Sequence, residues 1–420
     1  MLGSKIFNRI KQTEEKYSDY LYSIQLLTMI PSLNKEIFQP DEALQKLGLL
    51  DKVANTTRFK RFRARTASTY VDIARNAISL KHSEIVSIFE HALKVSPMDD
   101  KSVLQNFIIY EFNYGFDDAY LRQLIGQYFS RFNKWDKDEK NKLIHVINIA
   151  LKLLNGEKNS ARNWLSGYVK EYQLSGLQQI PLVSYFAFNE GHDNEKIRQA
   201  AYIAGEVLRT RQDGLFTRYL QNKKVMIVGN GPQNIGTGYG AQIDKFEVVV
   251  RFNNGVGVQK FSKDYGRKTT VWGRNNAAPY GNFKNLKGMK FCILVDSIER
   301  MHWKDEQIGK CYNELIKSKC RLIAPERKFL QQIFKKYDFS RFTSGLLAIA
   351  YIVSLSEGSK ISICGFSSAD KKLSECDSFY GQQKLSFYSD KSSNREAGFL
   401  NHSFEMEKLL MGDLLEAIGG

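Results

Sequence analysis

One stretch in the middle of the chain, residues 225–270, limits the fold more than any other. It contains two short apolar runs, 225–228 and 248–250, with glycines at positions 229, 231, 236, 238 and 240 between them. This order predicts a strand, a glycine loop, a helix and a second strand, which together make half of a nucleotide-binding α/β unit. Glycines after a buried strand let the backbone approach a ligand closely, and the amides of such a loop can face a phosphate. The stretch therefore predicts a ligand site at the carboxyl end of the first strand.

Beyond residue 220, short apolar runs alternate with helical segments. The predicted strands are 225–228, 248–251, 269–272, 291–295, 321–323 and 361–366, and the predicted helices include 344–355 and 402–418. This alternation favours an α/β fold with a mostly parallel sheet and helices on both faces. Ligands of such sheets bind at the carboxyl ends of the strands, where the glycine loop lies.

The preceding half of the chain reads as helical nearly throughout. Amphipathic helices are predicted over 68–80, 84–95, 119–132, 160–171 and 195–210. Another is predicted to begin at Asp136, which has the spacing of a capping box with Glu139, and to end at Asn155-Gly156. We therefore predict an all-α domain over 1–215 and an α/β domain over 216–420. Successive helices of this length favour a helical-repeat array, and an irregular bundle fits the spacing nearly as well.

Composition narrows the class of protein and its partners. The chain has 61 Lys and Arg residues against 45 Asp and Glu, a net charge of +16, which favours an anionic partner such as a nucleotide, acidic glycan, nucleic acid or lipid surface. Five cysteines without a C-x-x-C pair disfavour a disulfide framework or a zinc site. No apolar run approaches the roughly 20 residues of a membrane span, and the first residues lack a signal-peptide core. We therefore expect a cytoplasmic protein.

The glycine loop matches neither of the two common phosphate-binding motifs. The third glycine of the Rossmann pattern is missing from its place, and no Gly-Lys-Ser/Thr follows as in a P-loop. By itself, the loop is compatible with a plain tight turn. An NAD(P)-linked enzyme would need an acidic residue at the end of the second strand to bind a ribose, and Arg251-Phe252-Asn253 stands there instead.

The order of residues from 225 to 270 carries more information than its glycines. It reads Val228-Gly229-Asn230-Gly231, Gly238-Tyr239-Gly240, Ile243-Asp244, Val248 to Asn253, and Asp264 to Thr270. This order and spacing resemble the large motif of the animal-type sialyltransferase family. The resemblance implies a Rossmann-like GT-A-variant fold in which Asn230 and Asn253 contact the CMP part of a sugar donor. An amide suits that contact because it can both donate and accept hydrogen bonds. Gly229, Gly231 and Arg251 complete this part of the predicted donor site.

Two shorter segments resemble the other motifs of that family. Thr343-Ser344-Gly345, followed by an apolar helix and a strand that ends at Gly365, resembles the small motif. Hydroxyls and a glycine at the start of a helix suit the polar groups of a nucleotide. His402 and Glu407 have the spacing of the very small motif, in which the histidine is the general base. We therefore predict donor-binding residues at 343, 344, 345 and 365, and catalytic residues at 402 and 407.

The sequence departs from the family pattern in two ways. Ser386-Phe387-Tyr388 stands where a histidine and two aromatic residues are expected. The role of that histidine, to aid the leaving phosphate, is therefore predicted to fall to Tyr388 or to a nearby basic residue, Lys384, Lys391 or Arg395. The cysteine pair and the N-terminal anchor of the secreted enzymes are missing. The resemblance, which covers roughly 225–410, is therefore to a bacterial cytosolic member, either free or peripheral on the inner membrane.

Together these features predict an inverting glycosyltransferase. It would move sialic acid, or a related ulosonic acid such as Kdo, from a CMP-activated donor to a hydroxyl of a lipid-linked surface glycan, such as lipopolysaccharide or capsule. No metal, cofactor or nucleic acid is expected, since no Asp-x-Asp follows a predicted strand and the family needs none. Two alternatives stay open at this stage: an NAD(P)-linked Rossmann-type enzyme, and a helical-repeat binding protein with an inactive transferase domain.

Overall fold

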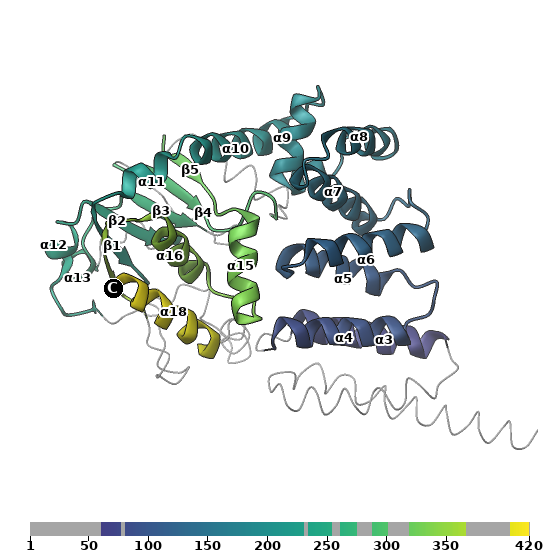
Figure 1. Ribbon diagram of the computed structural model, residues 1–420, viewed down its shortest axis with the longest axis horizontal. Helices are drawn as coiled ribbons and strands as arrows, with labels where there is room; N and C mark the ends of the chain where they lie inside the picture. Colours follow the sequence, from purple (N-terminus) through teal and green to yellow (C-terminus); the bar gives the residue numbers. More distant parts are fainter. Residues whose placement is uncertain are drawn as a thin grey trace, which may run out of the picture. The chain divides into compact units, whose positions relative to one another are not determined.

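The structure is a computed structural model, and it describes seven parts of the chain (Figure 1). These are residues 60–76, 80–230, 234–253, 261–274, 288–300, 319–366 and 404–419. Contacts divide the chain into two compact units, one over 1–110 with 123–133 and the other over 111–122 with 134–420. Helices from residue 134 onward thus belong to the same unit as the sheet, and the domain boundary predicted at residue 215 stays a prediction.

The first unit consists of helices in its described part. It contains α3 (Lys60–Asn76), α4 (His82–Val95), most of α5 (Ser102–Tyr114) and the second half of α6 (Asp118–Arg131). Phe89 of α4 stacks on Phe107 of α5 with 4.7 Å between ring centroids. Arg63 of α3 donates from Nε to the Val95 carbonyl at 2.8 Å, and so satisfies a carbonyl at the end of α4. Whether these helices form a true repeat stays a prediction.

The second unit begins with the helices before the sheet. They are α7 (Glu139–Leu154), α8 (Lys158–Tyr172), the 3-10 helix η1 (Leu177–Gln179), α9 (Pro181–Asn189), α10 (Glu195–Gln212) and α11 (Leu215–Leu220). The end of α7 at Asn155 is confirmed, because the next residue, Gly156, has φ +76° and cannot continue the helix.

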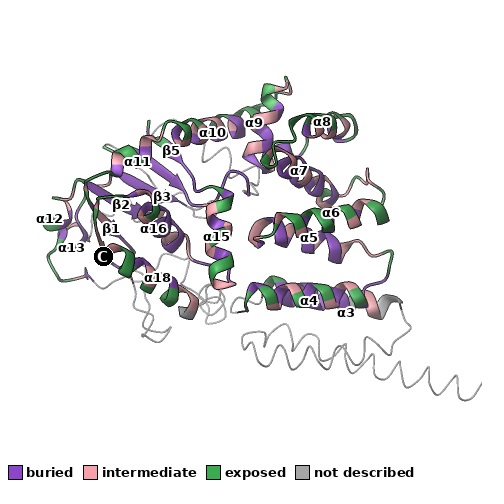
Figure 2. Cartoon of the chain, in the orientation of Figure 1, coloured by how far each residue is buried: buried purple, intermediate pink, exposed green. Residues whose placement is uncertain are grey.

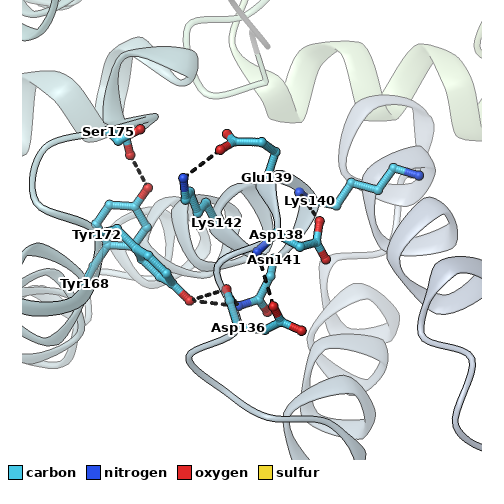
Figure 3. A network of polar contacts seen from close by, with 9 residues as sticks. All are labelled: Asp136, Asp138, Glu139, Lys140, Asn141, Lys142, Tyr168, Tyr172 and Ser175. Carbon is cyan, nitrogen blue, oxygen red and sulfur yellow. Dashed lines mark hydrogen bonds and ion pairs between the residues drawn. The ribbon is translucent and has the colours of Figure 1, made fainter.

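The predicted start of α7 at Asp136 is wrong (Figure 3). The helix begins at Glu139, and the N-cap is Asp138, whose carboxylate accepts the N–H of Lys140 at 2.8 Å. Asp136 stays outside the helix because its carbonyl accepts hydrogen bonds from Asn141 Nδ2 at 2.6 Å and from the Tyr172 hydroxyl at 2.8 Å. Tertiary contacts to α8 therefore override the local capping pattern.

Six strands of the described residues form one parallel sheet. They are β1 (Lys224–Val228), β2 (Val248–Phe252), β3 (Val271–Arg274), β4 (Phe291–Leu294), β5 (Arg321–Ile323) and β6 (Lys360–Cys364). Their order is β5-β4-β3-β2-β1-β6, and every neighbouring pair is parallel. The chain runs outward from β1 to β5 and then crosses back to place β6 on the other side of β1. The carboxyl ends of β1 and β6 therefore form the topological switch point, where open α/β sheets bind ligands.

Alternate residues of each strand pack into different cores, as the two-residue period of a strand requires. Val225 and Ile227 of β1 lie in a core with α11, α15 (Arg327–Tyr337), α16 (Ser344–Leu355) and α18 (Phe404–Gly419). On the other face, Val228 packs with the segment around α12 (Gly240–Ile243) and α13 (Ser262–Tyr265), and Cys292 of β4 packs with α10. Figure 2 shows the central strands as buried. The predicted α/β fold, with helices preceding and covering the sheet, is confirmed.

Within the described part of the chain, no helix combines the length and the apolar character needed to cross a membrane.

Candidate functional site

Two glycines meet where β1 and β6 end. Gly229 donates its N–H to the Cys364 carbonyl at 2.8 Å, which extends the β1–β6 pairing by one residue. A Cβ atom on Gly229 would lie 2.3 Å from the Gly365 carbonyl oxygen, and a Cβ atom on Gly365 would lie 2.8 Å from that of Gly229. Gly365 also has φ +72°, a conformation that side chains disfavour. Residues of the predicted large and small motifs therefore touch, backbone against backbone, at the switch point.

The two predicted asparagines lie at the ends of neighbouring strands. Asn230 follows β1, and its Nδ2 donates to the Phe252 carbonyl at the end of β2 at 3.4 Å. Asn253 follows β2 with φ +45°, in the left-handed region that asparagine tolerates better than most residues. Its carbonyl accepts the indole N–H of Trp272 at 2.9 Å. The structure thus brings Asn230 and Asn253 to one edge of the sheet, whereas Gly231 lies outside the described residues.

Two carboxylates of the large motif hold the loop backbone. Asp244 accepts the N–H groups of Arg267 at 2.9 Å and Lys268 at 2.8 Å. Asp264 accepts the N–H of Gly238 at 2.9 Å, and hydrogen bonds from the backbone of Gly238 and then of Gly236 hold the pKa of its carboxyl below the usual value. Acidic residues in this motif therefore position the glycine loop.

Arg251, predicted as a donor-binding residue, is buried within β2, with 4% of its surface exposed. Its guanidinium donates from Nε to the Lys268 carbonyl at 3.0 Å and from Nη2 to the Tyr265 carbonyl. These contacts tie β2 to the segment that carries Asp264. Direct contact of Arg251 with a donor stays a prediction.

A hydrogen bond joins the small motif to the C-terminal helix. Thr343 is the N-cap of α16, and its hydroxyl accepts the N–H of Leu346 at 3.4 Å. The backbone N–H of Thr343 donates to Glu407 Oε1 of α18 at 2.6 Å. Ser344 and Gly345 form the first turn of α16. The geometry gives Glu407 a positioning contact with the small motif, while its predicted catalytic role stays a prediction.

Besides Gly231, the predicted site residues Tyr388 and His402 lie outside the described residues. His402 precedes α18, which begins at Phe404 and packs on α16 through Leu410 and Leu414.

A row of buried arginines follows the carboxyl edge of the sheet. Arg251 lies in β2 and Arg274 ends β3, whereas Arg300 and Arg327 follow β4 and β5. Their exposed fractions are 4%, 1%, 8% and 3%. Sequence reasoning missed the last three, although an arginine that ends an apolar strand, as Arg274 does, was a usable signal. Guanidinium groups in this number favour an anionic ligand at this edge.

Comparison with protein-family models agrees with the resemblance predicted from the sequence motifs. The family model "Glycosyltransferase family 29 (sialyltransferase)" matches residues 185–418, more than half of the chain. The chain belongs to glycosyltransferase family 29. The resemblance predicted from the three motifs is thereby confirmed.

Among solved structures, a mammalian sialyltransferase matches with a TM-score of 0.32 and 16% sequence identity. That match covers 46% of this chain and 66% of the other chain, slightly less than two thirds. No curated protein sequence matches significantly. The family 29 region begins within α9, so helices α3 to α8 precede it.

Proposed function

We propose that this family 29 chain is an inverting glycosyltransferase whose donor is CMP-sialic acid or a related CMP-ulosonic acid such as CMP-Kdo. Family membership supports a CMP-sugar donor and a glycan acceptor. The observation that carries the proposal is the junction of Gly229 and Gly365, where residues of the large and small motifs meet at the β1–β6 switch point. Because neither glycine has a side chain, a ligand can lie against the main-chain groups of both residues.

In the proposed reaction, His402 takes the proton from a hydroxyl of the acceptor glycan. The hydroxyl oxygen then forms a bond to the anomeric carbon of the sugar, the bond from that carbon to the CMP phosphate breaks, and CMP leaves with the electron pair. A single displacement of this kind inverts the configuration at the anomeric carbon. The reaction needs neither a metal ion nor a cofactor.

The described residues supply the binding part of this mechanism. Asn230 and Asn253 hold CMP, together with the turn of Thr343, Ser344 and Gly345 at the start of α16. Tyr388, which lies outside the described residues, or a basic residue near it is proposed to aid the leaving phosphate. The Thr343–Glu407 hydrogen bond, at 2.6 Å, fixes this turn relative to α18. In the sequence, α18 begins two residues after His402.

The proposed acceptor is a lipid-linked surface glycan, met at the cytosolic face of the inner membrane. The net charge of +16 supports a negatively charged acceptor or membrane surface. The helices before the family 29 region would then bind the acceptor, the membrane or another enzyme.

The deciding experiment compares CMP-sialic acid with CMP-Kdo for the wild type and His402→Ala. Release of CMP and binding of CMP are measured side by side, the second by calorimetry. We expect CMP release from one donor by the wild type, and its loss in His402→Ala while CMP binding is kept. Tight CMP binding by the wild type without turnover, in the presence of varied glycan acceptors, would favour the inactive-domain alternative. Absence of CMP binding would refute the proposed function.

A further inference from the structure

The guanidinium of Arg300 is a buried cation that forms no ion pair with a carboxylate of the described residues. Arg300 lies six residues beyond β4, on the same edge of the sheet as Asn230 and Asn253, and only 8% of its surface is exposed. Within the described part of the chain, its guanidinium forms no hydrogen bond and no ion pair. Buried arginines are otherwise almost always paired.

Two aromatic rings hold this guanidinium in place. Its central carbon lies 4.9 Å from the ring centroid of Phe334 in α15 and 5.9 Å from that of Tyr114 in α5. Cation–π contacts of this kind orient a guanidinium and leave its N–H groups available at the edge of the plane. Arg300 is thus fixed in position without using its hydrogen-bond donors.

Two carboxylates near Arg300 form ion pairs with other arginines. Asp118 accepts from Arg327 Nη2 at 2.8 Å, and the carboxylate of Glu299 accepts from Arg211 Nη1 at 2.6 Å. Asp296 interacts with Arg300 electrostatically without forming an ion pair, and burial raises the pKa of its carboxyl. Burial, and then repulsion by Arg327, lowers the pKa of Arg300 to about 10. The surroundings of Arg300 therefore disfavour its charged form.

We propose that Arg300 binds the carboxylate of an acidic sugar. This inference rests on the proposed function, which supplies the anionic substrate. A guanidinium presents two parallel N–H donors that match the two oxygens of a carboxylate. β4 lies three strands from β1, roughly 14 Å at the usual strand spacing. Arg300 is thus placed for a group on the sugar side rather than for the phosphate at the glycine loop. The carboxylate belongs either to the donor sugar or to an acidic sugar at the end of the acceptor.

The test uses two variants of Arg300. Arg300→Met keeps much of the side-chain length and of the contacts with the aromatic rings but removes the charge. Arg300→Lys keeps the charge. Arg327→Met is the matched variant of a buried arginine that does have a partner. Arg198→Met is the surface control, because that side chain is 59% exposed and forms an ion pair with Asp193 far from the candidate site in sequence. Binding of CMP and of CMP-sialic acid or CMP-Kdo is measured by calorimetry, KM is measured for donor and acceptor, and Tm is measured for each protein without ligand.

A donor carboxylate at Arg300 predicts that Arg300→Met weakens binding of the CMP-sugar about tenfold to a hundredfold and leaves binding of CMP unchanged. An acceptor carboxylate predicts the same rise in KM for a sialylated or otherwise acidic acceptor, with no change for a neutral one. In both cases Arg300→Lys restores part of the loss, and Arg198→Met behaves as the wild type.

The second readout is stability. Because Arg300 forms no hydrogen bond or ion pair with the described residues, we expect Arg300→Met to raise Tm by about 3 °C. Arg327→Met, which leaves Asp118 without its arginine, is expected to lower Tm. Wild-type affinities for CMP-sugar and acidic acceptor that Arg300→Met leaves unaltered would overturn this inference. A wild type that binds no CMP-sugar would instead overturn the proposed function, so the two failures differ.

Discussion

Acid should destabilise this protein through a single histidine in the helices before the sheet. His145 of α7 is fully buried, and Trp135 stacks on its ring with 4.6 Å between centroids. Trp164 donates its indole N–H to Nδ1 at 3.0 Å, so the ring proton is on Nε2, which donates to the Lys134 carbonyl at 2.5 Å. Burial lowers the pKa of His145 from 6.5 to about 4.

The magnitude follows from this difference in pKa. Between pH 6.5 and 4, His145 is protonated in the unfolded chain and neutral in the folded chain. The free energy of unfolding therefore falls as the pH falls through this window. The full difference of 2.5 pH units corresponds to about 3 kcal/mol, of which about 2 kcal/mol is lost between pH 7 and pH 5.

The assay is urea unfolding followed by tryptophan fluorescence at pH 7.0 and pH 5.0. His145→Gln keeps a donor and an acceptor without a titrating ring, and His192→Gln is the control in the same unit, at a half-buried histidine that makes none of these aromatic contacts. We expect His145→Gln to lose about 2 kcal/mol less than the wild type between the two pH values, and His192→Gln to match the wild type. Equal losses in the wild type and His145→Gln would refute the reasoning.

Three further predictions concern the candidate site. Gly365→Ala should lower Tm and weaken CMP binding at least tenfold. The added Cβ atom would lie 2.8 Å from the Gly229 carbonyl oxygen, and residue 365 has φ +72°, which alanine disfavours. Unchanged CMP binding in calorimetry would contradict this prediction. Glu407→Ala should raise the donor KM by about tenfold or more, because the N–H of Thr343 loses its acceptor. Glu407→Gln should raise the donor KM less. Equal kinetics of both variants and the wild type would exclude the positioning role. Asp244→Ala should lower Tm measurably, since two backbone N–H groups lose their acceptor, and a calorimetric scan without a shift would count against that view.

The sheet was predictable because each strand is a short apolar run bounded by glycines or polar residues, as at 225–228 and 248–251. The meeting of Gly229 with Gly365 followed from motif order, since both lie at carboxyl ends of parallel strands. The start of α7 was not predictable, because a hydroxyl of α8 keeps Asp136 out of the helix. The burial of Arg300 was not predictable from the sequence either, since it depends on contact with Tyr114, which is remote in sequence. Local pattern fixes elements, whereas contacts between distant residues fix their ends and the environment of single charges.

The pairing of β1 with β6 has a consequence for synthesis of the protein. About 130 residues separate the end of β1 from the start of β6. At 5–20 residues per second, a ribosome needs roughly 7–26 s to make them. During that time β2 can cover one edge of β1, while the other edge presents unpaired N–H and carbonyl groups to the solvent. The crevice at the switch point is therefore a late product of translation, and the nascent chain offers chaperones, or another nascent chain, an open strand edge until β6 arrives.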